Sequence, residues 1–252
     1  MNAWRVLKSR EDKGAMQMAI DEAILTARSK NQVPNTLRFF TWKPVAVTIG
    51  FFQSLEQEID VKKTSELGID IIRRYTGGGA VLHDKELTYS MTLSEKDVPQ
   101  DIIESYKKIC AGIVNGLKSI GIDSAFSPIN DIIVNGKKIS GNAQTRRSGV
   151  VLQHGTILLD VDAKKMFSVL KVPDEKIRDK SIKNVEERVT SLKKELGGRD
   201  ITLKDLEKAL TAGFEQVFDV KFAEGELTLG EIKTAERLYK EKYSTREWCY
   251  WR

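Results

Sequence analysis

A glycine-rich stretch, RRYTGGGAVLHD at residues 73–84, is the first candidate for chemistry in this sequence. Glycines let backbone N–H groups approach a ligand closely, so such runs often hold phosphate. The stretch is not a P-loop, because no Lys-Ser or Lys-Thr follows the glycines, and it lacks the third glycine of a dinucleotide-binding loop. The residues on both sides read as strands. The glycines alone therefore leave a tight connection and a phosphate cradle equally open.

Two further polar groups follow along the chain. Asn130 and Asp131 come just before a predicted hairpin, and Lys138 lies after its turn, in KISGNA. The second group, Gln153-His154-Gly155, interrupts an otherwise apolar strand. Each group is weak alone, since a single histidine in a strand is more often a hydrogen-bonded core residue and a single lysine is often solvated.

Taken together, these groups fit the activation of a carboxylate by a nucleotide. Such a reaction needs cations and backbone donors around a phosphate, a carboxylate that places Mg²⁺, and an apolar slot for the acid. The guanidinium groups of Arg73 and Arg74 can each donate two hydrogen bonds to a phosphate, whereas Lys138 acts as a movable point charge. Asp131 supplies the carboxylate.

The helices and strands that must position these groups can be read from hydrophobic spacing. Apolar residues at helical intervals predict helices within 11–30 and 103–120, and Gly121 ends the second one. TLRFFTW and AVTIGFF read as paired strands, and Asn135-Gly136 predicts a two-residue hairpin. Helices and strands do not alternate regularly. The pattern predicts an α+β fold with mixed, largely antiparallel sheets flanked by helices.

Composition restricts the class of protein. The chain has 252 residues, 41 basic against 36 acidic side chains, and no apolar run of membrane-spanning length. Charges near the start argue against a signal peptide, so we expect a cytoplasmic protein without a membrane or nucleic-acid partner. The two cysteines, Cys110 and Cys249, are too few for a disulfide framework. Because Cys110 lies on the apolar stripe of a predicted helix, we expect a buried, inert thiol.

Four motifs in fixed order carry a resemblance to a known family. RRYTGGGAVLHD, the Asn130-Asp131 pair, GKKISGNA and QHGTILL closely resemble the catalytic domain of lipoate–protein ligases. That family lies within the superfamily of biotin and lipoate protein ligases and octanoyltransferases. The resemblance extends from the first helix to KYSTREW near the end. It implies one catalytic domain over residues 1–252, without the accessory C-terminal domain of many bacterial ligases.

The resemblance implies a two-step reaction. Lipoate and MgATP would give lipoyl-adenylate, and a lysine of a lipoyl domain would then attack it. The acceptor would be a 2-oxoacid dehydrogenase E2, a glycine cleavage H protein or a similar protein. A separate small subunit would supply the accessory part, and the segment 171–192 would fold over the nucleotide.

The same resemblance assigns roles to individual residues. Lys138 would be the catalytic residue that bridges the activated carbonyl and the phosphate, and Asp131 would help to place Mg²⁺. The histidines would shape the pocket, and Arg73 with the glycine loop would line the phosphate and the lipoyl tail. The expected ATP and lipoyl-adenylate site comprises Arg73, Gly77, Gly78, Gly79, Ala80, His83, Asn130, Asp131, Lys138, Gly141 and His154.

Two alternatives stay open within this sequence. Octanoyltransferases share the fold and the lysine but pass the acyl group through a cysteine thioester, which needs a thiol near the lysine. No cysteine occurs in DSAFSPINDIIVNGKK or in GNAQTRRSGVVLQHG, so the ligase is the preferred expectation. The other alternative is a non-catalytic homologue that binds lipoyl domains, although such a binder has no need of Arg73, Asp131 and Lys138 together.

Overall fold

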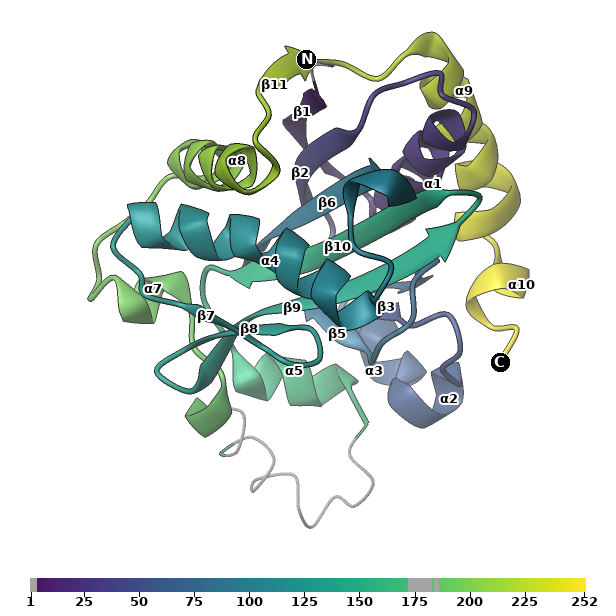
Figure 1. Ribbon diagram of the computed structural model, residues 1–252. Coiled ribbons are helices and arrows are strands. Elements are labelled where there is room, and N and C mark those ends of the chain that lie inside the picture. The colour runs from purple at the N-terminus through teal and green to yellow at the C-terminus, as the bar shows by residue number, and fades with distance from the viewer. Residues whose placement is uncertain (1–3, 172–182, 184–185) are drawn as a thin grey trace.

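The computed structural model describes residues 4–171, 183 and 186–252, and two sheets organise them (Figure 1). The larger sheet has eight strands in the order β11-β1-β2-β6-β10-β9-β8-β7. Its neighbours are antiparallel from β2 to β7, whereas β1 pairs in parallel with β2 and β11. These strands are β1 Trp4–Asp12, β2 Thr36–Trp42, β6 Glu86–Ser94, β7 Ala125–Ser127, β8 Asp131–Val134, β9 Lys137–Arg147, β10 Val150–Leu158 and β11 Phe222–Gly225.

The smaller sheet has three strands in the order β4-β3-β5, namely β3 Ala46–Ile49, β4 Asp70–Arg73 and β5 Val81–His83. The α+β prediction with largely antiparallel sheets is confirmed. The pairing predicted for TLRFFTW with AVTIGFF is wrong, because β2 pairs with β1 and β6 while β3 pairs with β4 and β5. The two strands therefore lie in different sheets.

The central strands β2, β6 and β10 of the larger sheet are buried on both faces, and successive side chains along them alternate between the two faces. Along β6, Leu87, Tyr89, Met91 and Leu93 join one hydrophobic cluster with side chains of α4 (Ile102–Ser119) and α8 (Leu203–Phe218). We call this side the helix face. Figure 1 shows α4 lying across it, with α8 alongside.

The opposite side, which we call the pocket face, bears polar side chains of the same strands. Glu86, Thr88, Ser90 and Thr92 alternate with the apolar residues of β6 and are also buried. Helix α1, Gly14–Ser29, packs against β6 and β10 on this side. Thr88 and one oxygen of Glu86 have hydrogen-bond partners, whereas the other Glu86 oxygen and the hydroxyls of Ser90 and Thr92 have none among the described residues.

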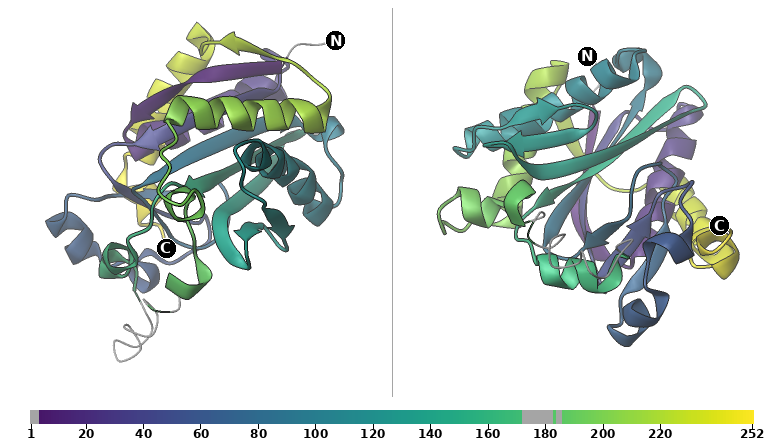
Figure 2. Two further views of the ribbon diagram at one scale, coloured as in Figure 1. Left: turned by 90° about the vertical axis from the view of Figure 1, so that its left-hand side faces the viewer. Right: turned by 90° about the horizontal axis from the view of Figure 1, so that it is seen from below.

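The remaining elements surround this frame (Figure 2). Thr228 and Glu231 form the predicted capping box, and Asp162 and Thr202 cap helices as expected. No helix in the described part of the chain combines the length and hydropathy needed to cross a membrane. The shorter elements are α2 Leu55–Glu58, α3 Val61–Glu66, η1 Glu95–Asp97, α5 Ala163–Val169, α7 Leu192–Glu195, α9 Leu229–Leu238, η3 Tyr239–Tyr243 and α10 Arg246–Cys249.

Candidate active site

A cavity of about 330 Å³ opens between the pocket face and the smaller sheet. Its walls come from the glycine loop, β5, β6, β9, β10 and the start of α5. Apolar side chains make up one part of the lining and charged or amide side chains another. Of the expected site residues, the cavity is lined by Gly78, Gly79, Ala80, His83, Asn130, Lys138, Gly141 and His154. Residues from four separate sequence motifs therefore line one cavity.

Lys138 stands at the partly exposed side of this cavity. Its Nζ lies 2.7 Å from Oδ1 of Asp131 on the neighbouring strand, with side-chain exposures of 41% and 34%. Gly141 leaves room for it, since a Cβ at that position would lie 2.8 Å from both Cε and Nζ of the lysine. The backbone O of Lys138 accepts a hydrogen bond from the Thr190 N–H. The ammonium group is thus held at the cavity by strand pairing and by one carboxylate.

Asn130 contributes to the same wall through its backbone. Its carbonyl accepts a hydrogen bond of 2.8 Å from Nδ2 of Asn142, and its own Nδ2 donates to the Asn142 carbonyl. Asp131 faces Lys138 and does not itself line the cavity. No three His, Cys, Asp or Glu side chains converge as metal ligands within the described residues. The placement of Mg²⁺ by Asp131 stays a prediction.

The glycine loop is fixed by Arg74. This guanidinium donates two hydrogen bonds of 2.9 Å, to the carbonyls of Gly77 and Gly79. Gly78 has φ of +96°, a conformation that favours glycine. On its outer side the loop touches Gly50, where a Cβ would lie 2.0 Å from the Gly78 carbonyl oxygen. Burial lowers the pKa of Arg74 to about 10, so it remains cationic at neutral pH.

Arg73 does not take the place expected for it. The side chain is fully buried outside the cavity, and it donates only to backbone carbonyls. Three of these follow β3, at Gly50, Phe51 and Gln53, and three lie at the C-terminal end, at Trp248, Cys249 and Arg252. The physical reason is strand alternation, because successive residues of an extended chain point to opposite sides. Arg74 therefore reaches the cavity, and Arg73 connects the segment after β3 to the C-terminal segment.

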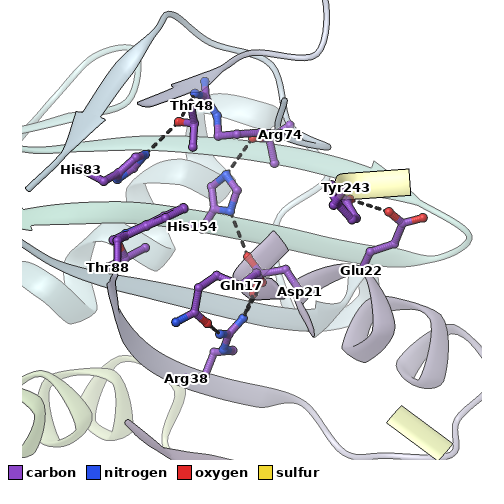
Figure 3. Close-up of polar contacts among 12 residues, drawn as sticks. Gln17, Asp21, Glu22, Arg38, Thr48, Arg74, His83, Thr88, His154 and Tyr243 are labelled. Carbon is purple, nitrogen blue, oxygen red and sulfur yellow. Dashed lines mark hydrogen bonds and ion pairs between the residues drawn. The ribbon is translucent and has the colours of Figure 1, made fainter. Parts of the chain in front are cut away.

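His83 lies in a buried hydrogen-bonded group on the floor of the cavity, and Figure 3 shows its contact with Thr48. Its Nε2 is 2.8 Å from the Thr48 hydroxyl and its Nδ1 is 2.6 Å from Oε1 of Glu86. The imidazole also stacks on Trp42, with ring centroids 4.0 Å apart. Arg74 donates to the same Thr48 hydroxyl at 2.7 Å. These contacts fix the ring and connect it to the arginine that holds the glycine loop.

His154 has a similar arrangement on the other side of the floor. Its Nδ1 is 3.1 Å from Oδ2 of Asp21, and its Nε2 is 2.7 Å from the Thr76 hydroxyl. Burial lowers the pKa of His154 although Asp21 opposes this shift, so the ring is neutral at pH 7. Nδ1 then donates to Asp21, and Nε2 accepts from Thr76.

Asp21 is itself paired with Arg38 behind the histidine (Figure 3). The two side chains are 2.6 Å apart and almost completely buried. Burial opposes ionisation of Asp21, but Arg38 and His154 outweigh it, and the pKa of Asp21 lies below its ordinary value. Gln17 accepts a further hydrogen bond from Arg38. The pocket face thus contains the buried ion pair of Asp21 and Arg38 next to the neutral ring of His154.

Several of these partners were missed from the sequence. Asp21 occurs in a helix that was read only by its apolar stripe, and Glu86 and Thr88 occur in a strand that was read only by its apolar residues. The signal that could have found them was the regular placement of polar residues at every second position of ELTYSMTLS. Residues 172–182 and 184–185 of the segment expected to close over a nucleotide lie outside the described residues.

Comparison with known proteins now decides the family. The model of the lipoyl protein ligase A/B catalytic domain matches residues 13–215. The chain belongs to this family. Octanoyltransferase LipM of Kyrpidia tusciae is 39% identical over 99% of this chain and 99% of its own length. Octanoyltransferase LipM of Clostridioides difficile is 40% identical over 98% of each.

A solved structure of the family has a backbone similar to that of this chain. The bi-partite lipoate protein ligase from Thermoplasma acidophilum, studied with its E2 lipoyl domain, has a TM-score of 0.88 and 35% identity. The match covers 98% of this chain and 96% of that one. Membership of the lipoyl protein ligase A/B family therefore makes this chain an enzyme of protein lipoylation.

The curated relatives correct the expected activity. ATP-dependent ligation of lipoate was expected, but proteins that match this chain over nearly its whole length are octanoyltransferases. The alternative left open by the sequence agrees with them better. The error has a plain cause, because both kinds of enzyme share the fold and the lysine. The motifs that carry the family resemblance do not separate the two reactions.

Proposed function

We propose that this chain is an octanoyltransferase. It would move an octanoyl group from the thioester of an acyl carrier protein to a lysine of a lipoyl domain, such as that of a 2-oxoacid dehydrogenase E2 or a glycine cleavage H protein. The observation that carries this proposal is the full-length similarity to octanoyltransferases from two organisms. The geometry of the cavity supports it in two ways.

The cavity provides an apolar slot next to charged groups. Met18, Trp42, Leu158 and Met166 are among its lining side chains, and its volume of about 330 Å³ lies at the lower end for small-molecule sites. Each methylene of an acyl chain that leaves water contributes about 0.8 kcal/mol to binding. A saturated eight-carbon chain therefore has both space and a driving force in this cavity.

Lys138 lines the same cavity as these apolar side chains, and its position supports a role at the carbonyl group of the acyl chain. Attack of an amine on a thioester carbonyl develops negative charge on the carbonyl oxygen. A positioned cation stabilises this charge more than it stabilises the neutral thioester, which is the condition for catalysis. Asp131 restrains the ammonium group, and Gly141 keeps the space around it open. Lys138 is the residue to which we assign this role.

The experiment that tests the function uses the purified chain with octanoyl-acyl carrier protein and a lipoyl domain, without nucleotide. We expect a gain of one octanoyl group on the domain, measured by intact mass. A parallel reaction contains free octanoate or lipoate with MgATP and monitors pyrophosphate. No modification from the carrier thioester, together with modification from free acid and ATP, would contradict octanoyl transfer. Binding of the lipoyl domain without modification in either reaction would identify a non-catalytic homologue.

A further inference from the structure

Glu86 is a buried acidic side chain at the cavity to which the proposed reaction assigns no role. It lies at the start of β6, it is 3% exposed, and it is among the residues that line the cavity. Burying a carboxyl group is costly unless hydrogen bonds within the protein replace those made to water. The contacts of Glu86 therefore indicate which parts of the cavity it holds in place.

Two hydrogen bonds converge on one oxygen of Glu86. Oε1 accepts from the Thr88 hydroxyl at 2.6 Å, and it lies 2.6 Å from Nδ1 of His83. Since a carboxylate oxygen is an acceptor, Nδ1 is the donor in the second contact. The other oxygen, Oε2, is buried and has no partner among the described residues. The side chain is thus held at the floor of the cavity through His83 and Thr88.

The first arm of this arrangement runs from Glu86 to the glycine loop. The other ring nitrogen of His83, Nε2, contacts the Thr48 hydroxyl, which also accepts a hydrogen bond from Arg74. Figure 3 shows the ring of His83 pointing to Thr48. Arg74 in turn holds two carbonyls of the glycine loop. The position of the loop therefore depends on the position of the His83 ring, which Glu86 fixes.

The second arm runs from Glu86 to the apolar wall of the acyl slot. The Thr88 hydroxyl accepts a hydrogen bond of 2.7 Å from the indole N–H of Trp42. The same indole stacks on His83, so both arms restrain it. A Cβ at Gly14 would lie 3.0 Å from this ring, which shows that the start of α1 is packed closely against it. The orientation of the slot wall thus depends on the same carboxylate.

The strand register places this wall at the far end of the slot from Lys138. Gly141, against which Lys138 lies, is opposite Thr156 on β10, and Thr156 is opposite Thr88 on β6. Neighbouring strands lie about 4.8 Å apart, so Thr88 is roughly 10 Å from Gly141. An extended eight-carbon chain with its carbonyl group at Lys138 spans a similar distance. The tail of an octanoyl group would then end at the wall that Trp42 and Thr88 form.

On the basis of the proposed function, we infer that Glu86 is a positioning residue that acts on both ends of the bound acyl group. Through Thr88 it fixes the wall at which the acyl tail ends, and so limits the chain length that the slot accepts. Through His83 it fixes the arginine that holds the glycine loop, and so supports the rate with every chain length. Glu86 takes no part in bond making itself.

Four variants separate the two arms. Thr88→Val removes the hydroxyl that restrains Trp42. The ratio of kcat/KM for decanoyl- over octanoyl-acyl carrier protein should then rise about tenfold, because each methylene that gains room improves binding about fourfold. Arg74→Lys should lower kcat/KM for both chains by the same factor. Glu86→Leu should show both effects, and Glu86→Gln, whose amide oxygen still accepts hydrogen bonds, should recover most of the wild-type ratio.

The matched control is Glu231→Leu. Glu231 is also buried and accepts two hydrogen bonds from Arg5, but it does not line the cavity. The control should lower the melting temperature and leave the chain-length ratio unchanged. A readout that needs no turnover is the indole N–H resonance of Trp42, assigned with Trp42→Phe. This resonance should shift in Glu86→Leu and stay in place in the control.

The contradicting results are distinct. An unchanged chain-length ratio in folded Glu86→Leu, or an equal change in Glu231→Leu, would overturn the inference. If Glu86→Leu does not fold, Thr88→Val decides, because an unchanged ratio there would remove the second arm. If the wild-type enzyme transfers nothing from the carrier thioester, the proposed function fails. An unchanged Trp42 resonance would then show that Glu86 does not position the wall either, whereas a shift would support that positioning without the proposed function.

Discussion

The helix face and the pocket face of the larger sheet are built from the same strands but differ in the side chains that they bury, which are apolar on the helix face and polar on the pocket face. On the helix face, Leu87 and Tyr89 pack with α4 and α8 in a close-packed apolar layer. On the pocket face, Glu86, Thr88 and His154 are also buried, but Thr88 donates to Glu86, and His154 is hydrogen-bonded to Asp21 and Thr76. The helix face contributes buried apolar surface to folding, and the pocket face arranges polar groups around a cavity. The comparison teaches that a polar residue in a strand does not by itself indicate a site. Gln153 and His154 are adjacent and polar, but only His154 lines the cavity, whereas Gln153 contacts Cys110 on the helix face.

The largest effect is expected on the pocket face, from Lys138→Ala. Loss of one well-placed charge that stabilises a developing oxyanion costs about 3 kcal/mol, so octanoyl transfer should fall by roughly 10²–10³-fold. The melting temperature should stay nearly constant because the lysine is partly exposed. The matched control is Lys137→Ala on the same strand, whose side chain is exposed. Equal losses in both variants would show a general effect of surface charge and not a catalytic role.

The helix face should respond in the opposite way to Gly213→Ala. A Cβ at Gly213 would lie 2.2 Å from the Gly112 carbonyl oxygen, so α8 must move away from α4. Overpacking of this kind lowers the free energy of unfolding by about 3 kcal/mol, measured by urea denaturation. The transfer rate per folded molecule at 25 °C should not change, and Lys208→Ala on the exposed side of α8 is the control. A large loss of rate in folded Gly213→Ala would show that the two faces are coupled.

A smaller effect is expected from Arg74→Lys. A lysine can replace the charge but not the pair of hydrogen bonds to Gly77 and Gly79, so the glycine loop should loosen. We expect kcat/KM to fall about tenfold, which corresponds to about 1.4 kcal/mol. Arg146→Lys is a matched control, because Arg146 also holds two loop carbonyls, at Pro99 and Gln100, and does not line the cavity. Similar losses in both variants would contradict a specific role for Arg74.

The smallest effect concerns stability against pH. His154 has a lowered pKa in the folded protein, so the unfolded chain binds the proton more readily below about pH 6.5. Stability from this group is therefore present above pH 6.5 and falls as the pH drops, by up to about 1.4 kcal/mol per unit. Asp21, whose pKa is also lowered, adds a loss below about pH 3.9. Urea unfolding of wild type and His154→Gln should show that the variant lacks the slope just below pH 6.5; an unchanged slope would contradict the assignment.

Much of the fold could be predicted because its signals are local. The Asn135-Gly136 turn, the Thr228–Glu231 capping box and the end of α4 just before Gly121 each depend on a few adjacent residues. The sheet membership of β2 and β3 depends on partners far along the chain, and spacing does not encode it. Lys138 and the glycine loop, which line the cavity, could be singled out because their motifs are long.

The parts of the site that the sequence did not predict depend on the direction in which side chains point from the folded backbone. Arg73 and Arg74 are identical in type, and only the path of the backbone decides which one meets the cavity. Asp21 reaches His154 across 133 positions of sequence. The reaction was predicted wrongly because both kinds of enzyme share the fold and the lysine, and the lack of a cysteine near Lys138 in the sequence favoured the ligase.

The most direct test of this account is a single-turnover time course with enzyme in excess over octanoyl-acyl carrier protein, with a lipoyl domain and EDTA and without nucleotide. We predict that loss of the carrier thioester is accompanied by gain of one octanoyl group on the lipoyl domain, without nucleotide. A product that appears only when free acid and MgATP are supplied would contradict it.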